Sequence, residues 1–288
     1  MKKTFTIFLA ICCLLACLGC RTEKQAALTV TGWDLQSRDN QQIADGVACL
    51  QLDFQDSNGM PHIVYCLTVD PKKATLHKGT SKNQLSILPT ERQNVLEHLQ
   101  SSVSDGLDAV AAVNGDFFAI SSSFIPSGLS VKNGIVLREN TNFRPFCAIT
   151  KSGDYIVRDG KTEKVDLSSL EMATGGSHVL VKNGAIPDIE DDSSLSTVSH
   201  PRTLSGVCED GTILLVVIDG RQPKHSNGAT LAQCAELMRS LGAIHAINHD
   251  GGGSSTMITR KGDQYTVVNS PSDGNLRDVF CSIQVVLK

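Results

Sequence analysis

One stretch, Gly242 to Ser255, constrains the fold more than any other part of the chain. It starts with an apolar run, Ala243 to Ile247, which is typical of a buried strand that delivers polar groups to the end of a sheet. The polar and small residues that follow are Asn248, His249, Asp250, Gly251, Gly252, Gly253, Ser254 and Ser255. The glycines allow positive φ and a close approach to a bound group. A tight turn capped by Asp250 and Ser254 is the alternative, but the whole string favours a ligand site.

Composition and charge bound the class of protein. Of 288 residues 41% are apolar, which is ample for a sizeable core in one large domain or two small ones. The 26 basic and 30 acidic residues nearly balance, and no basic cluster is long, so no nucleic-acid partner is expected. The sequence shows no long linker and no repeat. It therefore predicts a single domain over residues 28–288.

The N-terminus has the pattern of an export signal. A positively charged start precedes an apolar run, Phe5 to Leu15, that is too short to span a membrane. Cys17 and Cys20 each follow a small residue, which resembles the lipobox of bacterial lipoproteins. We expect residues 1–20 to be a lipoprotein signal peptide, with Cys20, or alternatively Cys17, lipidated, and residues 21–27 to be a tether. The protein is then exported and held at the bacterial cell envelope, on the periplasmic side or the cell surface. A plain secretory signal is the alternative.

The six remaining cysteines are scattered singly, and several lie in apolar patterns. They are predicted to be small buried side chains, although the sequence leaves their disulfide state open. No CxxC spacing occurs among them. His245 and His249 are four residues apart across a strand end rather than on a helix, so no zinc pair is proposed. We expect neither a metal nor another cofactor.

Strand signals dominate the chain, and turn dipeptides such as Asn133-Gly134 join several of them into hairpins. The predicted strands are residues 27–35, 47–54, 62–69, 108–113, 129–137, 147–150, 155–157, 179–186, 203–208, 212–218, 243–247, 264–268 and 279–287. Two main helices are predicted over residues 90–103 and 230–241, starting at capping boxes that begin with Thr90 and Thr230. The fold class is therefore α+β or mixed α/β, a strand-rich domain with a mixed sheet.

The last third of the chain predicts a β-α-β unit. The strand 212–218 ends in Asp219, Gly220 and Arg221, the helix 230–241 follows, and the strand 243–247 ends in Asp250. The two strands of such a unit lie parallel, so both end at the same edge of the sheet. Open α/β sheets place ligands at that edge. An earlier strand, 108–113, is likewise followed by Asn114, Gly115 and Asp116.

These strings together resemble the phosphodiester glycosidase family. The motifs that carry the resemblance are Asn114 to Phe118, Pro126 to Gly128, Arg202-Thr203, Val217 to Arg221, Gly228 to Leu231, Ala246 to Ser255, and Asn269 to Asp273 with Arg277. The similarity runs from about Val113 to the C-terminus and is weaker before it. His249 is a departure, because members more often have an apolar residue there.

The resemblance implies a hydrolase that converts a sugar-1-phosphate diester into free sugar and a phosphate monoester. Arginine suits a phosphodiester because its planar guanidinium bonds two oxygens at once. We expect Arg202, Arg221, Arg277, Asn114, Asn248 and the loop Gly251 to Ser255 to bind the substrate phosphate. The candidate catalytic carboxylates are Asp250 first, then Asp219 and Asp116. The sequence does not say which of them is nucleophile, acid or base.

Two other readings remain open from the sequence. One is a non-catalytic envelope protein that binds anionic glycan in the same cleft, and the other is a factor in exopolysaccharide biosynthesis or export. Several carboxylates facing an anion favour the hydrolase, because binding alone does not need them. The expected partner is a glycan or glycolipid phosphodiester. The sugar, its anomer and the group on the other side of the phosphate are not determined.

Overall fold

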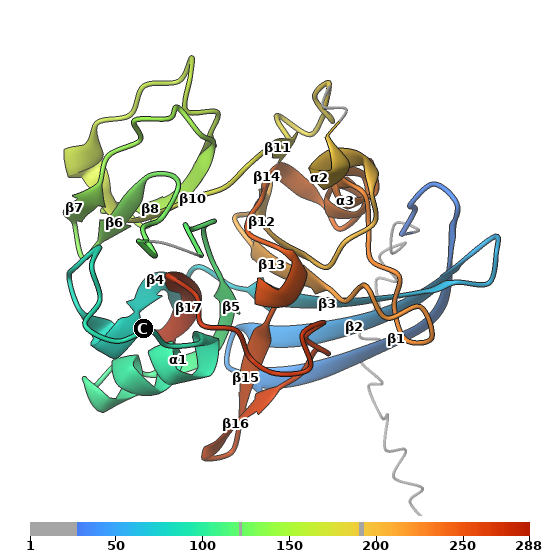
Figure 1. Cartoon of the computed structure of the whole chain (residues 1–288), viewed down its shortest axis with the longest axis horizontal. Helices are drawn as coiled ribbons and strands as arrows, with labels where there is room; N and C mark the ends of the chain where they lie inside the picture. The colour runs from blue at the N-terminus through green and yellow to red at the C-terminus, as the bar shows by residue number, and fades with distance from the viewer. Residues whose placement is uncertain (1–27, 121–122, 190–192) are drawn as a thin grey trace, which may run out of the picture.

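The computed structural model describes residues 28–120, 123–189 and 193–288, which form three sheets with helices packed on two of them (Figure 1). The predicted signal peptide and tether, and with them Cys17 and Cys20, lie outside the described residues. Within the described part, no helix is long and apolar enough to cross a membrane.

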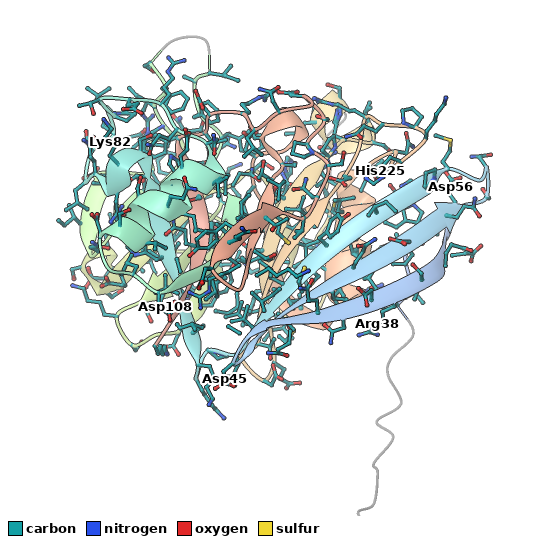
Figure 2. All side chains as sticks on the ribbon, turned by 90° about the horizontal axis from the view of Figure 1, so that it is seen from below. Arg38, Asp45, Asp56, Lys82, Asp108 and His225 are labelled. Carbon is teal, nitrogen blue, oxygen red and sulfur yellow. The ribbon has the colours of Figure 1, made fainter. Side chains whose placement is uncertain are left out.

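The first sheet has seven strands in the order β1-β2-β3-β13-β12-β14-β11. Their bounds are β1 Trp33–Ala44, β2 Val47–Asp56, β3 Pro61–Val69, β13 Ile213–Ile218, β12 Arg202–Cys208, β14 Ala243–Asn248 and β11 Val179–Val181. Strands β1 to β3 are long and extend from the body of the molecule. Figure 2 shows Asp45, two residues before β2, and Asp56, the last residue of β2, at opposite ends of these strands.

Two smaller sheets complete the framework, in the orders β7-β6-β10-β8-β9 and β16-β15-β5-β17-β4. The second sheet consists of β6 Ser130–Lys132, β7 Ile135–Arg138, β8 Phe146–Thr150, β9 Tyr155–Arg158 and β10 Leu170–Gly175. The third consists of β4 Ala74–Thr80, β5 Ala109–Asn114, β15 Met257–Lys261, β16 Gln264–Val267 and β17 Cys281–Leu287. Short helical turns occur at η1 Ser81–Asn83, η2 Leu167–Ser169, η3 Gly252–Ser254 and α2 Ser194–Thr197.

The core lies between the sheets, and successive residues of a strand point into different parts of it. In β13, Ile213, Leu215 and Val217 join a cluster that also takes residues from the second and third sheets. The intervening residues of β13 point the other way, into a cluster with helix α3 (Leu231–Ser240). Because this strand is buried on both faces, it reads in the sequence as one continuous apolar run.

The C-terminal β-α-β unit needs a correction. Strands β13 and β14 run in the same direction, but β12 lies between them and pairs antiparallel with both. All pairings of the described strands are antiparallel, so the predicted mixed sheet is wrong. The Asp210-Gly211 turn returns β12 onto β13, and a second edge of β12 is then free to accept β14. Which strands become neighbours in a sheet depends on contacts between residues far apart in the sequence, and an apolar run does not specify those contacts.

The helix starts were predicted with mixed success. Helix α3 begins after Thr230, whose side chain accepts from the Gln233 amide in the predicted capping box. Helix α1 spans Val95–Ser104 and is capped by Asn94 with Glu97, so the predicted start at Thr90 is wrong. Asn94 and Glu97 form the same reciprocal pair of bonds four residues later, and Asn is as good a cap as Thr.

The predicted strands also differ from the observed ones. Strand β1 begins at Trp33 and continues to Ala44, beyond the predicted strand 27–35. Strands β4, β10 and β15 were not predicted. Most of β1 is polar and exposed, so its pairing with β2, rather than an apolar pattern, makes it a strand.

We expect Asn94→Ala to lower the free energy of unfolding by about 1 kcal/mol, because it removes the acceptor for the Leu96 and Glu97 amides. Thr90→Ala is the matched control and should change stability by less than about 0.5 kcal/mol, as surface substitutions usually do. Urea unfolding of both variants measures the difference. Equal losses would contradict the assignment of Asn94 as the cap.

Candidate functional site

A cavity of about 300 Å³ lies where the loops after β14 and β13 meet the start of β12. We call it the arginine cavity. Its lining residues are Phe117, Ser194, Leu195, His200, Pro201, Arg202, Arg221, Asp250, Gly251, Gly252 and Arg277. It therefore brings together one of the three predicted carboxylates, all three predicted arginines and part of the glycine loop.

Asp250 is the carboxylate of this cavity. It is half-buried, and its Oδ1 accepts from the Gly251 amide at 3.0 Å. Burial raises the pKa of Asp250 from 3.8 to about 6, and the negative charge of Asp116 adds to that rise. The Ser254 hydroxyl, the Gly251 amide and Arg277 pull the pKa down again, although Ser254 makes no well-aligned hydrogen bond. A carboxylate with this pKa changes its charge close to neutral pH.

The end of β5 fixes the position of Asp250. The Asn114 side chain donates to the Asp250 carbonyl at 2.7 Å, and the Asp250 amide donates to the Gly115 carbonyl at 3.1 Å. Asn114 is 1% exposed and also accepts from the Thr203 hydroxyl and the Thr256 amide. It therefore holds the loop rather than facing the cavity.

Asp116 lies behind the cavity and does not line it. It is 1% exposed, and its Oδ2 accepts from the Gly128 amide at 2.7 Å. Burial raises the pKa of Asp116 to about 6, while the Gly128 amide, Lys78 and Arg144 act against the rise. Gly128 and Gly175 leave room for it, since a Cβ on Gly175 would come within 2.6 Å of the carboxylate.

Two of the three arginines have no carboxylate partner among the described residues. Arg202 is 1% exposed and donates to the carbonyls of Ala229, Leu195 and Val198, with no carboxylate partner among the described residues. Arg221 adopts a left-handed φ of 58° directly after β13, which turns its guanidinium onto Gly252. Both therefore keep a positive charge that a bound anion can neutralise.

Arg277 differs because it already has a partner. Its Nε and Nη2 donate to Asp273 Oδ2 at 2.9 and 2.6 Å. The pair lies over Gly253, where a Cβ would come within 2.2 Å of both side chains. A substrate phosphate would have to share this arginine with Asp273.

The glycine loop makes room for protein side chains. Gly252 has φ 62° and contacts Arg221, Gly253 contacts Arg277, and Gly251 contacts the Pro201 carbonyl. The amides of Gly252, Ser254 and Ser255 donate to carbonyls of the protein. We expected this loop to bind phosphate, but these three amides are not free to do so. The Gly252 amide donates to the Pro201 carbonyl, and the other two close the η3 turn.

Asp219, the second predicted carboxylate, is a structural anchor outside the cavity. It is 1% exposed and accepts from Asn269 Nδ2 at 2.9 Å, from the Ser270 amide at 2.9 Å and from His225 Nε2 at 2.9 Å. It thereby holds the start of the segment that carries Asp273 and Arg277. His225 lies at the same end of the first sheet as Asp56 (Figure 2).

Asn248 and His249 are also turned away from the cavity. Asn248 donates to Ser177 Oγ and to the His249 carbonyl. The His249 ring is fully buried, with Nδ1 3.0 Å from the Gly175 carbonyl and Nε2 2.6 Å from Ser205 Oγ. Burial lowers the pKa of His249 to about 4, so the ring is neutral at pH 7. This unusual histidine ties β14 to β10 and β12 behind Asp250.

Five lining residues were not predicted as site residues: Phe117, Ser194, Leu195, His200 and Pro201. Two of them, His200 and Phe117, carry aromatic rings. His200 Nδ1 lies 3.4 Å from Arg221 Nη2, and burial together with Arg202 and Arg221 lowers its pKa. Phe117 is stacked under Arg144, with the guanidinium carbon 5.0 Å from the ring centroid. Phe117 lies within the Asn114 to Phe118 motif, and His200 lies two residues before Arg202, so position in or next to a motif was the available signal.

Metal ligands are not gathered at this site. No group of three or more His, Cys, Asp or Glu is placed to hold a metal ion in the part of the chain that the structure describes. The six cysteines from Cys49 to Cys281 are free thiols, and five of them are buried. The expected absence of a cofactor stays a prediction.

The two carboxylates Asp219 and Asp250 should respond oppositely to amide substitution. Asp219→Asn should lower the free energy of unfolding at pH 7.5 by about 1–3 kcal/mol, because it leaves buried donors unpaired. Asp250→Asn should raise it by about 1 kcal/mol, because it removes a charge that burial disfavours. Two pKa units correspond to roughly 3 kcal/mol, and solvent contact reduces that figure.

The pH dependence provides the internal control for Asp250. Because its folded pKa lies above its unfolded value, the ionised carboxylate costs stability above pH 6, and that cost disappears as pH falls from about 6 to 3.8. The gain from Asp250→Asn should disappear over the same range in urea unfolding curves. A gain that is independent of pH would rule out this explanation.

The chain is similar to one family model and to several solved structures. A family model described as phosphodiester glycosidase matches residues 108–286. The catalytic domain of zebrafish N-acetylglucosamine-1-phosphodiester alpha-N-acetylglucosaminidase, auto-inhibited by its pro-peptide, is similar in structure, with a TM-score of 0.66 and 17% identity over 88% of each chain. A hypothetical protein from Synechocystis matches with a TM-score of 0.66 and 13% identity, over 89% of this chain and 68% of that chain. These structures share the fold.

A curated relative matches a shorter region. An uncharacterized protein of Rickettsia conorii is 33% identical over 86 residues, which is 30% of this chain and 29% of that protein. The chain thus spans less than a third of the length of the curated relatives it matches. The family model, by contrast, covers more than half of the chain, including the β5 end, the arginines and Asp250. The chain belongs to the phosphodiester glycosidase family.

Proposed function

We propose that the arginine cavity hydrolyses a glycosyl phosphodiester, with Asp250 as the group that accepts the proton of the attacking water. The observation that carries this proposal is the placement of Asp250 in a cavity lined by Arg202, Arg221 and Arg277. The solved relative from zebrafish acts, by its title, on an N-acetylglucosamine-1-phosphodiester. This supports the same class of bond as the substrate here, while the sugar itself stays open.

The arginines bind the phosphate and take up charge as it leaves. Arg202 and Arg221 have no carboxylate partner among the described residues, so the diester anion supplies the missing charge. As the bond between the anomeric carbon and the phosphate oxygen breaks, a second negative charge develops on the departing monoester. Fixed guanidinium groups stabilise that charge without reorganising.

Asp250 activates water at the anomeric carbon. Above pH 6 the carboxylate is ionised and accepts a proton, while the water oxygen bonds to the anomeric carbon. The electron pair of the broken bond leaves with the phosphate monoester. A phosphate leaves readily as an anion, so one carboxylate is sufficient in the cavity. Asp116 lies outside the cavity, and its negative charge raises the pKa of Asp250.

The site of action proposed for this chemistry is the bacterial cell envelope. The support is the signal-like N-terminus with Cys20 or Cys17 as the lipid acceptor. The proposed substrate is accordingly a glycan or glycolipid phosphodiester, and the proposed attachment to the membrane is the lipid anchor.

Asp250→Asn should lower kcat on a panel of sugar-1-phosphate methyl diesters at least about 100-fold, because general bases contribute typically 10²–10⁴-fold. In the native protein kcat/KM should rise with pH and level off above about pH 6, since the base acts when ionised. Asp263→Asn, an exposed carboxylate between β15 and β16, is the matched control and should keep full activity. Glycan binding without turnover of any panel member would favour the non-catalytic alternative.

Hydrolysis in water enriched in ¹⁸O identifies the bond that breaks. Attack at the anomeric carbon leaves the phosphate monoester free of ¹⁸O, as read by mass spectrometry. Attack at phosphorus would place one ¹⁸O in the monoester. That result would make the protein a phosphodiesterase and overturn the assignment of Asp250 as the base for attack on carbon.

A further inference from the structure

A second cavity, of about 480 Å³, shares no lining residue with the arginine cavity and is linked to it by one side-chain contact. We call it the side cavity. It is lined by Asn142 to Pro145, Asp159, Lys161, Ser177 to Val179 and Pro187 to Ile189. These residues come from the loops beside the second sheet and from both ends of β11, where the chain crosses from β10 to the first sheet (Figure 1). Its volume is within the range of small-molecule sites, about 300–1,000 Å³.

Arg144 joins the two cavities. It lines the side cavity, while its guanidinium stacks on Phe117, which lines the arginine cavity. Arg144 Nε donates to the Gly176 carbonyl at 2.9 Å, and its amide donates to Asn140 Oδ1 at 2.9 Å. Its position is therefore fixed before any ligand arrives. The stacked pair therefore forms part of the wall of each cavity.

Phe143 provides an aromatic face at the side cavity. It is 61% exposed and adopts a left-handed φ of 52°, which is uncommon for a bulky residue. Phe143 also lines a third cavity, of about 460 Å³. Strained backbone conformations of this kind cluster at ligand sites, where the surrounding structure holds them in place.

The chemistry of the side cavity matches a sugar. A pyranose ring has a face of C–H groups that packs on an aromatic ring, and hydroxyls that need both donors and acceptors. Phe143 offers the ring, Asn142 offers donor and acceptor, and Asp188 offers acceptors. In the side cavity two carboxylates, Asp159 and Asp188, balance Arg144 and Lys161. The arginine cavity has three arginines and one carboxylate in its lining, which suits an anion. The division between the two cavities follows the two parts of a glycosyl phosphate.

We propose that the side cavity is the sugar subsite, which holds the glycosyl group of the diester with Phe143 against one face of the ring. This inference rests on the proposed function, because it assumes that the phosphate occupies the arginine cavity. The alternative occupant is the group on the other side of the phosphate. A single series of substrates separates the two.

Phe143→Ala in the full-length protein should raise KM for sugar-1-phosphate methyl diesters about five- to tenfold and leave kcat within about twofold, because the ring contributes binding and not chemistry. Leu88→Ala is the matched control: this side chain is 62% exposed and lines none of the three cavities.

Saturation-transfer NMR with a panel of free hexoses and N-acetylhexosamines should show binding to the native protein and loss of that binding in Phe143→Ala. Binding of inorganic phosphate should survive in Phe143→Ala and be lost in Arg221→Ala.

The possible outcomes separate the two proposals. Sugar binding that depends on Phe143, without turnover of any diester, overturns the hydrolase and supports the sugar subsite. Turnover with unchanged kinetics in Phe143→Ala, or no sugar binding by the native protein, overturns the subsite and leaves the hydrolase. If Phe143→Ala alters discrimination between diesters that differ only in the non-sugar group, that group occupies the cavity and the inference is wrong.

Discussion

One buried amide, the side chain of Asn114, holds the candidate site together. It donates to the Asp250 carbonyl and accepts from the Thr203 hydroxyl and the Thr256 amide. The third sheet, the first sheet and the loop between them are thereby linked at one point. Loss of this side chain would leave buried polar groups of all three segments unpaired, and such groups are costly in a protein interior.

The same region concentrates positive charge around a carboxylate that is only partly solvated. Burial raises the pKa of both Asp116 and Asp250 to about 6, so both carboxyls change charge much closer to neutral pH than an exposed aspartate does. The main chain of neighbouring loops, rather than acidic side chains, orients Arg202. This arrangement leaves charge available for an anionic ligand. Perturbed pKa values beside an unpaired guanidinium are typical of functional sites.

The glycines after β14 show how a motif can be recognised correctly and explained incorrectly. They permit a close approach, as their residue type indicates. The groups that approach are the guanidinium of Arg221 at Gly252 and that of Arg277 at Gly253. Their effect on a substrate is therefore indirect, through the arginines that they allow into the cavity. Asp219 acts in a similar way, by anchoring the segment that leads to Arg277.

The sequence by itself determined most strands, the cap at Thr230 and the candidate motifs. Apolar runs, capping boxes and glycine turns are all local patterns. It also located Asp250 and the three arginines, because each lies in a short motif next to a strand end. Only the tertiary structure decided that β12 lies between β13 and β14, and that Asp219 points into a hydrogen-bond network while Asp250 faces the cavity. Strand neighbours and side-chain partners are contacts between distant residues, and no local pattern encodes which partner is chosen.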